Sequence, residues 1–244
     1  LYLAGWSGTK LYCYTERVSE RTTEQTTYSW DTSTKQLSHL ENVPAFYKCI
    51  PTTQGLLTCS EINGLDVRFR LYDKNWRVLH TWSFCRPSDL TLVDDQHLVF
   101  LTTNNQTLQM SLKILDLKTY QLKSLHRGTL LTGVAASPTK DIFYFSKQRG
   151  KYTRIYAVPL KTLHPKRLSI RSPRDECWHI WGTSNDGKWL LLRANVSHPY
   201  PVDFYAIHLN TGKRVLLLDD VIDAAPAPIT GTTNTPIKSN TKTR

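Results

Sequence analysis

The sequence has little of what membrane proteins and most enzyme classes require. Its apolar runs extend over only a few residues, which excludes a membrane-spanning helix of about 20 residues. The five cysteines include no Cys-x-x-Cys pair and the eight histidines are scattered, so no zinc-ligand spacing is present. There is also no Gly-rich phosphate loop and no Gly-x-Ser-x-Gly motif of a serine hydrolase. We expect no metal and no cofactor, and nothing in the sequence argues for catalysis.

The basic residues are in excess but are not clustered. Lys and Arg number 31 against 20 Asp and Glu, which gives a formal net charge of +11. Residues 221–244 contribute little to this excess, which therefore belongs to the folded part. Such a charge favours an acidic partner. Because the sequence has no dense Lys/Arg run and no basic helix, we do not expect this partner to be nucleic acid.

The sequence does contain an internal repeat. A turn followed by an apolar strand recurs, and its equivalent positions from Leu11 to Leu190 are spaced by 45, 42, 44 and 48 residues. A second marker, from Asp31 to His208, lags behind the first and is spaced by 42, 43, 43 and 49 residues. Two markers that recur with nearly the same period argue against a chance repeat.

Each period contains four short stretches rich in β-branched and aromatic residues, separated by Gly, Pro, Asn or Asp. In the last unit these stretches are WHIWGT, KWLLLRA, DFYAIHL and KRVLLL. Four strands in a period of about 42–45 residues are typical of one β-propeller blade. We predict an all-β propeller of about five four-stranded antiparallel blades, with a β-sandwich as the alternative.

The predicted blades and the tail follow from the repeat. The blades lie near residues 1–41, 42–82, 83–126, 127–170 and 171–220. Residues 221–244 begin as DAAPAPIT and become rich in Thr and Lys, which is typical of a disordered tail. No spare strand is visible for ring closure, so either five blades close by packing or the chain is a fragment of a larger ring. No signal peptide is visible. Because the chain starts at Leu1 and not at Met, we expect upstream sequence to be missing.

The last two units resemble a known family. SNDGKWLLLRA (184–194) followed by FYAIHLNTGKRVLLL (204–218) is similar to the TolB-like (WD40-like, PD40-type) propeller repeat. ASPTKDIFYFS (136–146) with RIYAVPL (154–160) repeats the pattern without its Asp-Gly turn. The first three units match mainly by their period. The resemblance implies a propeller, and because such propellers serve as binding platforms, peptidase lids and sensor domains, it does not choose a function.

Two cysteines in one predicted hairpin form a candidate disulfide. The hairpin FYKCIPTTQGLLTCSEI is centred on Gln54, which would place Cys49 and Cys59 opposite each other on paired strands. Opposed positions lie within disulfide reach when they are not a hydrogen-bonded pair. A disulfide would indicate a periplasmic or extracellular setting, whereas two buried thiols would suit a cytoplasmic blade.

One face of the predicted propeller gathers arginines and tryptophans. It is built from the links between blades and the loops that join second and third strands. These segments and their borders carry Arg86, Arg127, Lys147, Arg149, Arg171, Arg174, Trp178 and Trp181. Mixtures of Arg and Trp are typical of binding surfaces, although the two tryptophans could instead pack between blades. The hypothesis is that this face binds an acidic or extended peptide-like partner.

The expected function is a non-catalytic propeller that binds a protein or another macromolecule. The TolB-like resemblance implies a periplasmic setting, such as the sensory region of a membrane-anchored regulator. Two alternatives stay open. A propeller lid of a prolyl-oligopeptidase-like serine peptidase predicts a catalytic domain after residue 220. A carbohydrate-active propeller enzyme predicts acidic residues clustered at the central channel.

Overall fold

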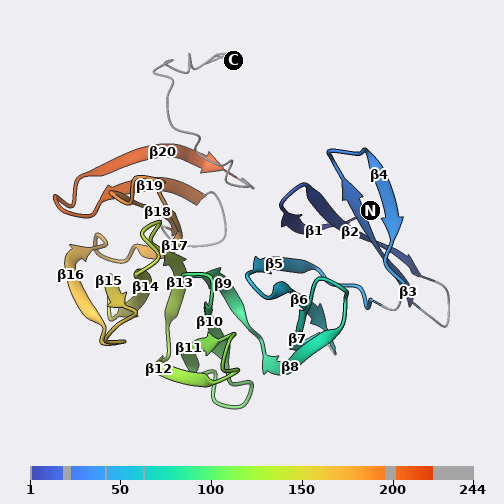
Figure 1. Cartoon of the computed structure of the whole chain (residues 1–244). Helices are drawn as coiled ribbons and strands as arrows, with labels where there is room; N and C mark the ends of the chain where they lie inside the picture. The colour runs from blue at the N-terminus through green and yellow to red at the C-terminus, as the bar shows by residue number, and fades with distance from the viewer. Residues whose placement is uncertain (1, 19–22, 42, 63, 196–201, 222–244) are drawn as a thin grey trace, which may run out of the picture.

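The computed structural model describes residues 2–18, 23–41, 43–62, 64–195 and 202–221. These residues form β-strands and no helix. The strands build five antiparallel sheets, each made of four strands that are consecutive in the sequence. Figure 1 shows the sheets as blades arranged in an arc around a common centre. The predicted all-β fold with five four-stranded blades is confirmed, and the β-sandwich alternative is wrong.

The strand bounds define the five blades. Blade 1 consists of β1 (Tyr2–Ser7), β2 (Lys10–Val18), β3 (Thr23–Asp31) and β4 (Gln36–His39). Blade 2 consists of β5 (Lys48–Thr52), β6 (Gly55–Glu61), β7 (Asp66–Tyr72) and β8 (Val78–Cys85). Blade 3 consists of β9 (Ser88–Leu92), β10 (His97–Thr103), β11 (Met110–Asp116) and β12 (Leu122–Gly128). Blade 4 consists of β13 (Leu131–Ala136), β14 (Ile142–Arg149), β15 (Tyr152–Pro159) and β16 (Lys166–Arg171). Blade 5 consists of β17 (Cys177–Thr183), β18 (Trp189–Asn195), β19 (Val202–His208) and β20 (Arg214–Val221).

The aspartates of the repeat shape the turns between third and fourth strands. In Asp31, Asp73 and Asp116, a carboxylate oxygen accepts a hydrogen bond from the backbone N–H two residues further on, at 2.8–2.9 Å. This is the Asx turn that such residues favour. The second sequence marker therefore records a recurring turn.

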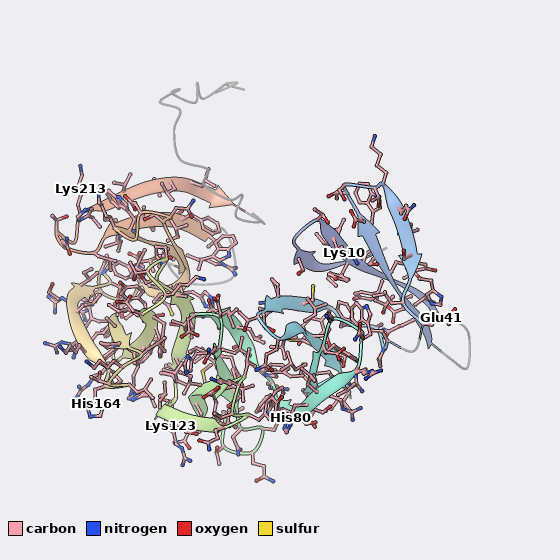
Figure 2. All side chains as sticks on the ribbon, viewed as in Figure 1. Lys10, Glu41, His80, Lys123, His164 and Lys213 are labelled. Carbon is pink, nitrogen blue, oxygen red and sulfur yellow. The ribbon has the colours of Figure 1, made fainter. Side chains whose placement is uncertain are left out.

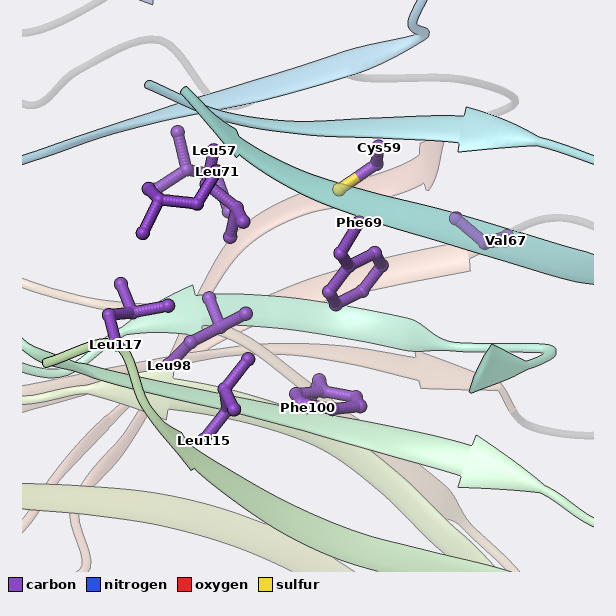
Figure 3. Close-up of a cluster of buried hydrophobic side chains, with 10 residues drawn as sticks. Leu57, Cys59, Val67, Phe69, Leu71, Leu98, Phe100, Leu115 and Leu117 are labelled. Atoms are coloured by element: carbon purple, nitrogen blue, oxygen red, sulfur yellow. The ribbon is translucent and has the colours of Figure 1, made fainter. Parts of the chain in front are cut away.

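The apolar core lies between neighbouring blades. Figure 3 shows one such seam, in which Phe69 and Leu71 of blade 2 face Leu98 and Phe100 of blade 3. The ring centroids of Phe69 and Phe100 lie 5.4 Å apart. Equivalent clusters fill the seams between blades 3 and 4 and between blades 4 and 5. Figure 2 shows polar side chains such as Lys123 and Lys213 at the outer rim. Consecutive blades therefore bury their facing apolar surfaces against each other.

The arc is open between blade 5 and blade 1. The two blades stand apart in Figure 1, and no strand of either completes the sheet of the other in the described part of the chain. Trp30 and Leu37, cross-strand partners on blade 1, are 39% and 65% exposed. Leu218 of β20 is 52% exposed. The described residues therefore do not form a five-bladed ring closed by packing, which was one of the two alternatives from the sequence. The expected tail at 222–244 lies outside the described residues.

The predicted disulfide is wrong because the hairpin register differs by one residue. Thr52 pairs with Gly55, so Cys49 lies opposite Thr58 and Cys59 lies opposite Lys48. The two cysteines therefore point to opposite faces of blade 2 and are free thiols. Gly55 directly follows the turn of this hairpin, and glycine is needed there because a Cβ would lie 1.9 Å from the carbonyl oxygen of Tyr72. Burial raises the pKa of each thiol to about 12.

Candidate functional site

A cavity of about 640 Å³ lies among the first strands of blades 3, 4 and 5. Its size falls within the range of ligand-binding sites. β13 contacts both β9 and β17, so these three strands form one continuous wall. β13 contributes only the small side chains of Val134, Ala135 and Ala136. The larger and polar lining residues come from other strands, namely β5, β9, β17, β18 and β19. They are Lys48, Asp89, His179, Trp181, Arg193 and Phe204.

Irregular first strands shape this cavity. The pairing of β9, β13 and β17 with their second strands shifts register in each case, as in a β-bulge. Bulges re-aim side chains and are common beside functional sites. Asp89 lies in the irregular part of β9 with φ of +52°, a left-handed conformation that is rare for a non-glycine residue. The bulge in β17 lies at Trp181.

The close approach of β13 and β17 depends on Gly133. A Cβ at this position would lie 2.4 Å from both the backbone nitrogen and the backbone oxygen of Ile180. The Thr132 hydroxyl also donates a hydrogen bond to the Trp178 carbonyl oxygen at 2.9 Å. These contacts hold the first strands of blades 4 and 5 together at the cavity wall.

Two residues from blades that flank blade 4 meet at the cavity. His179 Nε2 of β17 lies 2.9 Å from Asp89 Oδ1 of β9. The side chains are 41% and 20% exposed, respectively. Among the described residues that line the cavity, Asp89 is the one carboxylate, and His179 engages it. The pair therefore ties blade 3 to blade 5 and leaves the remaining charges of the cavity positive.

A cationic and aromatic row crosses blade 5 beside this pair. His179 lies directly opposite Arg193, and Arg193 lies directly opposite Phe204, so the three side chains share one face of the sheet. The rings of Phe204 and Trp181 pack with centroids 4.5 Å apart. In the described part of the chain, Arg193 has no carboxylate within ion-pair distance. Lys48 Nζ reaches the cavity from blade 2 and donates to the Leu90 carbonyl oxygen at 3.3 Å.

The structure does not gather the sequence-predicted residues into one site. Trp181 lines the central cavity. Arg171, Arg174 and Trp178 line a second cleft of about 550 Å³ between blades 4 and 5. Trp178 is also buried in the seam between these blades. Neither cavity, as far as the chain is described, is lined by Arg86, Arg127, Lys147 and Arg149.

The central residues Asp89, His179 and Arg193 were missed from the sequence. One pattern could have indicated Arg193, because it is the single charge inside the apolar strand WLLLRA. Asp89 and His179 lie far apart in the sequence and carry no local pattern. Within the described residues, no group of three His, Cys, Asp or Glu side chains could hold a metal ion. A helix long and apolar enough to cross a membrane is likewise not found among them.

Comparisons with known proteins agree on the architecture. No family model and no curated protein matches this sequence. TolB from Acinetobacter baumannii is 19% identical with a TM-score of 0.54, over 83% of this chain and 51% of that one. A protein assigned as dipeptidyl aminopeptidase IV from Bacteroides ovatus is 12% identical with a TM-score of 0.62, over 88% of this chain and 39% of that one. A protein assigned as TolB from Agrobacterium tumefaciens is 13% identical with a TM-score of 0.56, over 89% and 80%.

The identities are low, so the likeness concerns the fold alone. The chain spans about half the length of the Acinetobacter TolB structure and less than half of the peptidase structure. The repeat in the last two units and the five four-stranded blades agree with these neighbours. The chain therefore has the TolB-like β-propeller fold.

Proposed function

We propose that this chain is a binding module whose central cavity holds an extended, acidic segment of another protein. The observation that carries the proposal is Arg193, which lines the cavity beside Trp181 and Phe204 and has no carboxylate partner in the described part of the chain. An arginine in such a place can donate paired hydrogen bonds to a carboxylate of the partner. Lys48 adds a second positive charge at the same cavity.

The aromatic pair supports a polypeptide partner. The partly exposed ring of Trp181, packed on Phe204, offers apolar surface at the cavity that Arg193 also lines, a combination that is typical of interface anchors. An extended segment with alternating acidic and apolar side chains can place one set toward Arg193 and the other against the rings. Charge on the partner would also speed its association with a chain of net charge +11.

The charges of the cavity argue against the carbohydrate-active alternative. Glycoside hydrolysis in most families uses two carboxylates on either side of the bond that breaks. The described lining residues include one carboxylate, Asp89, and His179 engages it. The predicted cluster of acidic residues at the channel is therefore not found among these residues.

The periplasmic or extracellular setting is part of the proposal. It is supported by the likeness of the fold to TolB. The separation of Cys49 and Cys59 removes the disulfide as an argument for an oxidising compartment. A role as the sensory region of a larger membrane-anchored protein would use the same cavity for its partner.

Binding of designed peptides tests the proposal. A fluorescent peptide of alternating Glu and Val should bind, and the matched peptide of alternating Lys and Val should not. Arg193→Glu should weaken binding of the acidic peptide at least about tenfold, because it removes a charged hydrogen bond and adds repulsion. The control Arg167→Glu changes the same charge on exposed β16, outside both cavities. Equal losses in the two variants, or equal binding of both peptides, would contradict the proposal.

A further inference from the structure

The cleft between blades 4 and 5 is distinct from the central cavity. It has a volume of about 550 Å³ and shares no lining residue with the central cavity. Its apolar wall includes the partly exposed ring of Tyr152 of β15, together with Ile170, Trp178 and Ile207, which are 7%, 3% and 1% exposed. Its polar lining includes Arg171, Arg174 and Arg214. A cleft with an apolar wall and several arginines is suited to a ligand that is both apolar and anionic.

A buried carboxylate fixes one of these arginines. Glu176 is 7% exposed and accepts a hydrogen bond from Trp178 Nε1 at 2.6 Å. Arg214 binds the same carboxylate through both of its terminal nitrogens. Its Nη2 lies 3.0 Å from Glu176 Oε1, and its Nη1 lies 3.2 Å from Glu176 Oε2. The Arg214 Cζ also lies 3.5 Å from the ring centroid of Tyr205. Because a buried charge must be paired, Glu176 holds the Arg214 guanidinium in a fixed place on the cleft wall.

A second group of arginines has too few acidic partners. Arg171 lies directly opposite Arg154 in the pairing of β15 and β16, an arrangement of like charges that costs stability. In the described part of the chain, neither residue has a carboxylate within ion-pair distance. Arg174 shares Asp175 with Lys151, at 3.5 and 3.9 Å. An anion bound at the cleft would relieve this excess of positive charge.

We propose that the cleft binds a small ligand in which a carboxylate or phosphate is attached to a flat apolar ring. Guanidinium groups match planar carboxylates and phosphate oxygens with paired hydrogen bonds. The partly exposed ring of Tyr152 would pack against the ring of the ligand. This site does not depend on the proposed central site, because the two cavities have no residue in common.

Calorimetric titration of the 244-residue protein with phenyl phosphate, benzoate and inorganic phosphate tests the proposal. Phenyl phosphate or benzoate should bind, and the stronger of the two identifies phosphate or carboxylate as the preferred group. Inorganic phosphate should bind at least about tenfold more weakly than phenyl phosphate, because it lacks the ring that the apolar wall covers. Equal binding of these two probes would overturn the proposed ring contact.

Matched variants locate the binding. Arg171→Gln with Arg174→Gln should weaken binding about tenfold or more, since both residues are exposed cleft residues whose replacement leaves the core intact. Arg167→Gln on the same strand should leave it unchanged. Arg193→Glu in the central cavity should also leave it unchanged. Loss of binding in Arg167→Gln to the same extent, or no binding of either aromatic probe, would overturn the proposal.

Discussion

The two faces of blade 5 come from one sheet but differ in composition. The face toward blade 4 presents Ile180, Leu190, Leu192 and Ile207, all nearly inaccessible to solvent. The opposite face presents the cross-strand row of His179, Arg193, Phe204 and Leu218. Because side chains alternate along a strand, the same four strands supply both sets. One face packs the propeller together, and the other combines charge and aromatic rings beside the central cavity.

The comparison shows where function can be placed in a repeated fold. The packing face tolerates only side chains that fill the seam, because each blade is stable only against its neighbours. The other face of blade 5 has no blade against it in the described structure. This face carries Arg193, which lines the central cavity.

The largest expected difference is in stability. Leu192→Ala on the packing face should lower the free energy of unfolding by about 2–5 kcal/mol, because it opens a cavity in a filled seam. Leu218→Ala on the opposite face should change it by less than about 0.5 kcal/mol, because that side chain is half exposed. Urea unfolding of the two variants measures this. Equal losses would mean that the face with Leu218 is packed as tightly as the seam.

A second variant tests the contact between blades 4 and 5. Gly133→Ala should cost about 3 kcal/mol, because its Cβ would collide with the Ile180 backbone and φ is +79°. The control Gly150→Ala has φ of +60° but no atom near its Cβ, so it should cost only about 1 kcal/mol. Thermal or urea unfolding compares the two. If Gly150→Ala costs as much, the positive φ alone explains the need for glycine at position 133, and the contact with Ile180 does not.

Thiol reactivity sharpens the contrast between seams and surface. Cys49 and Cys59 should resist alkylation at pH 8, because burial raises the pKa of each thiol to about 12 and blocks the reagent. Partly exposed Cys85 should react first. Mass spectrometry of alkylated protein follows each site with time. After unfolding without reductant all five cysteines should react, and protection of Cys49 and Cys59 would instead show a disulfide.

The smallest effect concerns a turn outside both faces. Burial by itself raises the pKa of Asp94, but hydrogen bonds from the His97 ring and from the backbone N–H groups of Gln96 and His97 hold it below 3.8. The carboxylate therefore stabilises the fold above that pH, and this stability is lost as the pH falls through the lowered pKa. Asp94→Asn should cost less than about 1 kcal/mol at neutral pH. The free energies of unfolding of the variant and the parent should converge as the pH falls. A difference that stays constant with pH would contradict this stabilising role of the Asp94 carboxylate.

The sequence predicted the blades far better than the site. The period, the recurring aspartates and the four β-rich stretches of each period are local patterns, and the structure turns them into four-stranded blades with Asx turns at Asp31, Asp73 and Asp116. The hairpin of Cys49 and Cys59 was predicted one residue out of register, because its turn was taken to be centred on Gln54, whereas Thr52 pairs with Gly55. One residue of shift exchanges the two faces of a strand.

The central site was missed for a different physical reason. Asp89 and His179 meet only because blades 3 and 5 flank the same inner strand and because the first strands bulge. Neither stacking geometry nor a bulge leaves a short-range pattern in the sequence. The arginines predicted as one binding face are divided between the second cleft and positions outside both cavities.

The indole NMR resonances of Trp181 and Trp178 test the central claim most directly. Trp181 lines the central cavity, and Trp178 lies on the packing face of the same strand. Titration with the acidic Glu/Val peptide should shift the Trp181 resonance, identified by its loss in Trp181→Phe, and leave that of Trp178 in place. Arg193→Glu should abolish the shift. A peptide that binds without moving Trp181, or that moves Trp178 instead, would contradict the central cavity as the binding site.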